Sequence, residues 1–193
     1  MKSVSALVLA PGASAGRDQA ALVAIDHAMS ELGLLVERID FPYHLAGRRR
    51  PDAPGVLIET VVVSAKDLAA RAGTGTEAVL LGGRSMGGRI CSMAVAGGLP
   101  AAGLVLVSYP LHPPGRPDKL RTDHFPRLSV PCLFVSGIRD AFAAPSELEA
   151  ATVAIGGPVT HRWIDGDHSL RRREGEVASL VAGWIADQWS LRG

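Results

Sequence analysis

Short apolar runs alternate with longer segments of helical periodicity along the whole chain, and this alternation restricts its fold more than any other feature. Mostly uninterrupted apolar runs are typical of strands that are covered on both faces. Strands separated by helix-length segments pair in parallel, because a parallel neighbour needs a crossover connection. We therefore predict an α/β fold with a doubly wound, mainly parallel sheet of about six strands: Val4–Leu9, Leu34–Ile39, Ala78–Leu81, Leu104–Val107, Cys132–Val135 and Val159–Ile164.

Two of the intervening segments carry start and stop signals for helices. Asp18 is the expected cap of a first helix, which ends at Gly33. Asp52 and Gly73 bound a second helix that includes Val56–Val63. The β-branched residues of Val56–Val63 favour a strand by propensity, but the need for a crossover favours a helix, which we predict.

The second half of the chain is less regular. Ser146 and Glu149 have capping-box spacing for a short helix to about Ile155, and the last helix starts near Glu174. The proline-rich segment Ser108–Val130 is predicted to run as loop and turns over one edge of the sheet. Loops at the carboxyl ends of the strands are then the expected place for a site.

Length and charge narrow the class of protein. A chain of 193 residues suits a single domain, residues 1–193, with a substantial core. With 20 basic and 19 acidic side chains, bulk charge argues against binding to nucleic acid or to an anionic membrane. No apolar run is long enough to span a membrane. The expected partner is a small-molecule substrate, and the oligomeric state stays open because a free edge strand at Leu34–Ile39 could pair with another chain.

Two features bear on the compartment. Cys91 and Cys132 lie in apolar runs, where buried free thiols are the ordinary interpretation, which favours a reducing, cytoplasmic location. The apolar stretch near the N-terminus loosely resembles a secretory signal, but Pro11-Gly12 interrupts it. A buried strand that runs into a glycine-containing loop is the better interpretation.

The pentapeptide Gly83-Arg84-Ser85-Met86-Gly87 is the strongest chemical signal. It has the form G-x-S-x-G and lies between a predicted strand and a predicted helix, as a nucleophile elbow requires. The flanking glycines suit a strained serine that tolerates little bulk nearby. A glycine-rich turn with a serine helix cap is the alternative. We predict that Ser85 is a catalytic nucleophile.

A serine nucleophile needs a base, and the base needs an orienting acid. In this architecture the chain order is serine, acid, histidine. Asp140 follows the strand Cys132–Val135, and His168 lies in the loop between the last strand and the last helix. We therefore predict Asp140 as the acid and His168 as the base, with Asp165 and Asp167 as rival acids.

An oxyanion hole would use the backbone N–H after the nucleophile and one from the loop after the first strand. These residues are Met86 and Ala13. Pro11 has no N–H to donate, and Gly12 allows close approach of the backbone.

The remaining charged and polar motifs suggest little chemistry. Gly73-Thr74-Gly75 lacks the lysine of a phosphate-binding loop. The runs Arg48–Arg50 and Arg171–Arg173 are expected in solvent, with a minor alternative in which one receives an acidic substrate tail. No metal-ligand spacing occurs among the other histidines, which are His27, His44, His112, His124 and His161.

Four segments together resemble a group of small bacterial α/β hydrolases that is associated with dienelactone hydrolases and has testis-expressed and chromatin-complex relatives in vertebrates. The segments are Gly83–Arg89, Ser108–Gly115, Gly137–Asp140 and Gly166–Ser169. The resemblance implies a compact α/β-hydrolase fold without a large lid domain and the same five site residues. It departs at the elbow, where dienelactone hydrolases have cysteine, and at Pro11-Gly12, where the group commonly has His-Gly.

The sequence thus predicts a serine hydrolase that cleaves an ester or thioester and needs no cofactor or metal. Two alternatives stay open. The first is a catalytically idle hydrolase fold that serves as an interaction module. The second is an acyltransferase with the same acyl-enzyme, which differs only in the acceptor. The site is expected to be open and bounded by the segment Tyr109–Arg127.

Overall fold

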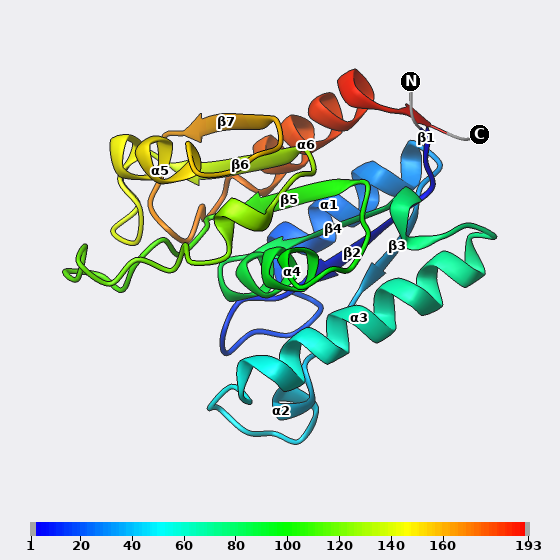
Figure 1. Ribbon diagram of the computed structural model, residues 1–193, viewed down its shortest axis with the longest axis horizontal. Coiled ribbons are helices and arrows are strands. Elements are labelled where there is room, and N and C mark those ends of the chain that lie inside the picture. The colour runs from blue at the N-terminus through cyan, green and yellow to red at the C-terminus, as the bar shows by residue number, and fades with distance from the viewer. Residues whose placement is uncertain (1–2, 192–193) are drawn as a thin grey trace.

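The computed structural model describes residues 3–191 and contains a six-stranded, wholly parallel sheet (Figure 1). The strand order is β3-β2-β4-β5-β6-β7, which confirms the predicted doubly wound architecture. The bounds are β2 Ala6–Ala10, β3 Leu35–Arg38, β4 Val79–Arg84, β5 Gly103–Val107, β6 Cys132–Gly137 and β7 Val159–Ile164.

The first predicted strand is divided in the structure. Ser3–Val4 form a separate strand, β1, which pairs in parallel with β8, Ser190–Leu191. This small sheet brings the two ends of the described chain together (Figure 1). The four central strands are completely buried along nearly their whole length, whereas β3 and β7 at the two edges are partly exposed, because each has only one neighbour.

Helices cover both faces of the sheet (Figure 1). On one face, α1 (Ala20–Glu31) and α6 (Glu174–Gln188) pack against each other and against the sheet. The other face is covered by α3 (Pro54–Arg71), α4 (Met86–Ala96) and α5 (Pro145–Thr152). Two apolar cores result, one on each side, and they hold the sheet rigid beneath the loops at its carboxyl edge.

The predicted helix through Val56–Val63 is confirmed within its predicted bounds, Asp52 and Gly73, but the predicted cap at Asp18 is wrong. The helix α1 starts after Gln19 without a side-chain cap, because the Asp18 carboxylate instead bonds to Arg38 at 2.9 Å. Similarly, Asp52 accepts a bond from Arg48, while α3 starts at Pro54. Proline suits a first helical position, since its missing N–H would have no partner there. Both aspartate side chains therefore bond to arginines and not to the start of a helix.

The glutamate that caps the start of α5 is Glu147, two residues before the predicted Glu149, and no full capping box forms because the N-cap residue Ala144 has no side-chain acceptor. Glu147 accepts a hydrogen bond from the Ala144 N–H at 2.9 Å, so Glu149 has no such role, and the helix ends at Thr152. The segment Ser108–Val130 has no α-helix, as predicted, and holds only the 3₁₀ turn η2, Phe125–Arg127. It packs with α4 on one face, where it buries several large side chains: Tyr109, Leu111, Phe125 and Leu128.

Two short helical elements complete the described chain: α2, Pro42–Leu45, and the 3₁₀ turn η1, Thr76–Ala78. No helix between residues 3 and 191 is both long and apolar enough to cross a bilayer. The direction of the strand order changes at β2, which lies between β3 and β4. Loops that follow β2 and β4 therefore diverge at the carboxyl edge and leave a crevice, the usual place for a ligand in open α/β sheets.

Candidate active site

Ser85 lies on a sharp turn between β4 and α4, at the carboxyl edge of the sheet. Its backbone has φ +50° and ψ −117°, a strained conformation for a residue with a side chain. The turn is tight because the backbone passes very close to β2. A Cβ on Gly83 would lie 2.2 Å from the Ala10 carbonyl oxygen, and one on Gly87 would lie 2.1 Å from it. Both positions therefore need glycine, and the strand-turn-helix placement predicted for the pentapeptide is confirmed.

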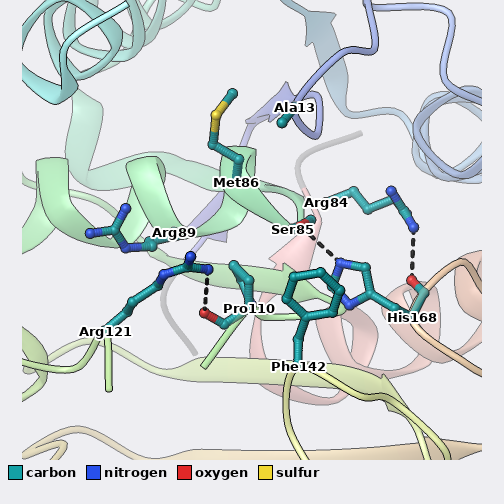
Figure 2. A pocket seen from close by; sticks show the side chains of 9 residues that line it. All are labelled: Ala13, Arg84, Ser85, Met86, Arg89, Pro110, Arg121, Phe142 and His168. Carbon is teal, nitrogen blue, oxygen red and sulfur yellow. Dashed lines mark hydrogen bonds between the residues drawn. The ribbon is translucent and has the colours of Figure 1, made fainter. Parts of the chain in front are cut away.

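Three side chains predicted to lie together form a continuous hydrogen-bonded chain. The Ser85 Oγ lies 2.9 Å from the His168 Nε2 (Figure 2). The His168 Nδ1 lies 2.9 and 2.8 Å from the two carboxylate oxygens of Asp140. Ser85, Asp140 and His168 follow β4, β6 and β7, so parallel strands bring residues distant in sequence to one edge.

The Asp140 carboxylate is buried and held in place. Its side chain has no exposed surface, and its Oδ1 also accepts the Phe142 N–H at 2.8 Å. The Phe142 ring stacks on the imidazole of His168, with the ring centroids 4.0 Å apart. Phe142 therefore restrains the imidazole from the side while Asp140 restrains it from the end.

The two rival aspartates have other partners. Asp165 pairs with Arg139 on the surface. Asp167 accepts bonds from the N–H and the hydroxyl of Ser169, which lower the pKa of the exposed Asp167 carboxyl. Of the three candidates, Asp140 is the carboxylate that contacts the imidazole.

A pocket of about 440 Å³ opens beside the Ser85 hydroxyl (Figure 2). Residues from four loops, the end of β4 and the start of α4 line it: Ala13, Arg84, Ser85, Met86, Arg89, Pro110, Arg121, Phe142 and His168. The predicted boundary from Tyr109 to Arg127 is correct in part, since Pro110 and Arg121 line the pocket while Tyr109 is buried beneath it. Ala13 and Met86, the two residues whose N–H groups were predicted as donors, are both among the lining residues.

Among the described residues of the loop after β2, Ala13 is the one that lines the pocket. Gly12 donates its N–H to the Gln19 side chain, Ser14 to the Tyr43 hydroxyl, and Ala15 to the Gly12 carbonyl. Within residues 3–191, the Ala13 N–H has no acceptor. Met86 is the first residue of α4, and an N–H at that position has no acceptor within its helix. Both groups are available to an oxygen bound in the pocket.

Arg84 belongs to the pentapeptide but was not predicted to act at the site. Its guanidinium donates a hydrogen bond to the His168 carbonyl oxygen at 2.7 Å, which ties the loop of His168 to the elbow (Figure 2). Burial lowers the pKa of Arg84, while the Asp140 and Asp167 carboxylates act in the opposite direction. Because this bond reaches a backbone atom 84 residues away, only the tertiary structure reveals it.

The predicted arginine runs do not line this pocket. Arg48–Arg50 line a separate surface hollow, and Arg171 lines shallow hollows outside the pocket. The pocket's arginines are instead Arg84, Arg89 and Arg121. The sequence signal for two of them was their place within the segment Gly83–Arg89, and for Arg121 it was its place within the predicted boundary Tyr109–Arg127.

Several remaining histidines have structural partners. The His124 Nε2 lies 2.8 Å from the Ser92 hydroxyl, and the His161 Nε2 lies 2.9 Å from the Thr152 hydroxyl. His112 lies between the Pro113 carbonyl and Glu147. Among the residues that the structure describes, no group of three or more histidine, cysteine or acidic side chains could hold a metal ion.

A serine on a strained elbow, bonded to a histidine and a buried aspartate above a parallel sheet, defines the α/β-hydrolase class. No lid domain covers the carboxyl edge within residues 3–191. Residues 3–185 match the model of the alpha/beta hydrolase domain family, and the chain belongs to this family.

Solved structures show the same fold. An alpha-beta serine hydrolase homologue from Coxiella burnetii is 18% identical, with a TM-score of 0.78 over 96% of this chain and 87% of that one. A serine hydrolase without a lid from Xanthomonas campestris is 17% identical, with a TM-score of 0.76 over 100% and 86%. Dienelactone hydrolase from Anabaena variabilis is 18% identical, with a TM-score of 0.74 over 97% and 88%.

Proposed function

We propose that this α/β hydrolase is a serine hydrolase that cleaves an ester or thioester through an acyl-enzyme on Ser85. The observation that carries the proposal is the chain of hydrogen bonds from Ser85 through His168 to the buried Asp140. Ser85 and His168 also line the pocket. A serine hydroxyl is a weak nucleophile until a base accepts its proton. The imidazole nitrogen at 2.9 Å is within reach of that proton.

In the first half of the reaction, the Ser85 Oγ attacks the carbonyl carbon of the substrate, and its proton moves to the His168 Nε2. The carbonyl oxygen becomes an oxyanion, which the N–H groups of Met86 and Ala13 stabilise. The intermediate then collapses. The bond to the leaving oxygen or sulfur breaks, and the His168 Nε2–H protonates that atom.

In the second half, water replaces the leaving group. His168 takes one proton from the water as its oxygen attacks the acyl carbon of the Ser85 ester. Collapse of this second intermediate returns the proton to the Ser85 Oγ and releases a carboxylic acid. Asp140 remains ionised throughout and stabilises the imidazolium that forms twice in the cycle.

The intact mass after exposure to a fluorophosphonate tests the proposal, because this reagent labels serines that are activated as nucleophiles. We expect one adduct on the wild type, none on Ser85→Ala, and one on Ser14→Ala. Ser14 is a suitable control because it is an exposed serine in the loop beside the pocket, also with positive φ. A folded wild type that takes no adduct would contradict the proposal and favour an idle fold that serves as an interaction module.

Hydrolysis and acyl transfer then remain to be separated. With a 4-nitrophenyl ester as substrate, hydrolysis gives equal amounts of 4-nitrophenol and free acid. An acyltransferase would release less free acid when an alcohol or thiol acceptor is added. We expect the equal ratio to persist, since the pocket is open to water at the Ser85 hydroxyl.

A further inference from the structure

The pocket beside Ser85 contains two arginines that have no anionic partner. Arg89 lies in the first turns of α4, and Arg121 lies in the long segment between β5 and β6. Both line the pocket, and their guanidinium groups lie near each other (Figure 2). Within residues 3–191 neither forms an ion pair, and no carboxylate side chain lines the pocket.

The two guanidinium groups are held close at an energetic cost. Burial lowers the pKa of Arg121, and the charge of Arg89 lowers it further. The Arg89 Nε is buried and has no hydrogen-bond partner. An unsatisfied buried donor of this kind destabilises a folded protein. An anion placed between the two guanidinium groups would offset the repulsion between their charges.

The neighbouring side chains do not supply that anion. Arg121 donates one bond to the Pro110 carbonyl, and the Tyr109 hydroxyl donates to the Arg121 carbonyl. His124 adds no third charge near neutral pH, because burial and then the charges of Arg89 and Arg127 lower its pKa to about 4. The remaining arginine of the pocket, Arg84, is different, since it is bonded to the loop of His168 and faces the Asp140 carboxylate.

The position of the pair indicates which part of a substrate carries the charge. Arg89 and Arg121 lie on the opposite side of Ser85 from His168 (Figure 2). The leaving group must stay close to the His168 Nε2, because it receives its proton from that atom. The acyl group of the substrate therefore extends toward the arginines.

We propose that Arg89 and Arg121 form a subsite for a carboxylate on the acyl group. The substrates are then half-esters or half-thioesters of dicarboxylic acids, in which one carboxyl group is esterified and the other is free. This inference rests on the proposed function and adds a substrate class to it. Guanidinium groups match carboxylates in shape and charge, and such bonds are stronger than bonds between neutral groups. The free carboxylate fixes the acyl chain, and the carbonyl at its other end meets the Ser85 hydroxyl.

A matched pair of substrates tests the subsite. The 4-nitrophenyl monoester of adipic acid carries a free carboxylate, and its methyl ester has the same chain with the charge removed. Both release 4-nitrophenol when Ser85 is acylated. We expect kcat/KM to be about ten-fold or more higher for the charged substrate, the range that one hydrogen-bonded charge pair supplies.

Three variants locate the effect. Arg121→Gln keeps an amide that can donate to the Pro110 carbonyl, and Arg89→Gln keeps a polar side chain in α4. Each should lower the preference for the charged substrate over the neutral methyl ester about ten-fold. Arg162→Gln on the exposed side of β7 makes the same change in net charge away from the pocket and should leave the preference unchanged.

The outcomes separate this inference from the proposed function. Equal rates on the two substrates, or a preference that survives both pocket variants, would overturn the subsite while leaving the hydrolase intact. No 4-nitrophenol from either substrate and no fluorophosphonate adduct would overturn the function itself.

A measurement without variants covers the case in which a variant does not fold. Adipate should protect Ser85 of the wild type from the fluorophosphonate, whereas the neutral adipamide should not. Equal protection by the two compounds, or none by adipate, would count against the subsite.

Discussion

Replacing Asp140 with asparagine changes the charge of the buried side chain and leaves its shape. The Oδ1 must remain an acceptor, because the Phe142 N–H donates to it at 2.8 Å. The new amide NH₂ then takes the place of Oδ2, 2.8 Å from the His168 Nδ1. An N–H on Nδ1 would then meet this donor at 2.8 Å as well as the Oδ1 at 2.9 Å, so the tautomer with its proton on Nε2, whose Nδ1 accepts from the amide NH₂, is favoured.

With its proton on Nε2, His168 cannot accept the proton of Ser85. The variant also loses the charge that stabilises the imidazolium. We expect the loss in kcat to be about 10⁴-fold, which corresponds to about 5.5 kcal/mol of transition-state stabilisation. The assay is the release of 4-nitrophenol, with the rate of fluorophosphonate labelling as a second readout that needs no knowledge of the substrate.

The matched controls are Asp165→Asn and Asp167→Asn, whose carboxylates bond to Arg139 and to Ser169. Each should keep activity within a few-fold of the wild type. Thermal unfolding shows whether any loss arises from instability. Asp140→Asn with more than a tenth of wild-type activity, or an equal loss in Asp167→Asn, would refute the assignment of Asp140.

Three further predictions concern the fold. Gly87→Ala should lower the free energy of unfolding, measured in urea, by about 1–3 kcal/mol, because its Cβ would overlap the last carbonyl oxygen of β2. The matched control Gly183→Ala lies in α6, where a Cβ meets nothing within 4 Å, and it should raise this free energy by about 0.5–1 kcal/mol. Burial opposes protonation of His112, but its bonds to a backbone carbonyl and to Glu147 outweigh this and raise its pKa. The stabilisation of the fold by protonated His112 is therefore complete below the pKa of His112 in the unfolded chain. It is lost as the pH rises through the pKa of His112 in the folded protein. The difference in Tm between wild type and Glu147→Gln should thus shrink from about pH 6 upward, and a difference that grows would contradict the sign. Burial raises the pKa of both cysteine thiols to about 12, so iodoacetamide should modify them only in urea, as intact mass would show.

The convergence of Ser85, Asp140 and His168 could be predicted because each follows a buried strand. The apolar runs identify the strands, and parallel strands end at one edge whatever their order. The sequence favoured Asp140 as the acid and kept Asp165 and Asp167 as rivals. The choice depends on Phe142, whose N–H bonds to the Asp140 carboxylate and whose ring packs on the imidazole.

The helix starts show where local reasoning fails. Asp18 has the right residue type for a cap, yet Arg38 takes its carboxylate from β3. Arg48 takes that of Asp52 in the same way. A cap is worth about 1 kcal/mol, and a competing partner can therefore replace it when the chain folds.

The sequence by itself determined the succession of strands and helices along the chain and the elbow at Ser85. Strand periodicity and the space available to a glycine act over only a few residues. The tertiary structure decided the strand order, the pairing of β1 with β8 and the meeting of Arg89 with Arg121. These features join segments that are distant along the chain. Their contacts exist only once the sheet has formed, and no local pattern of residues records them.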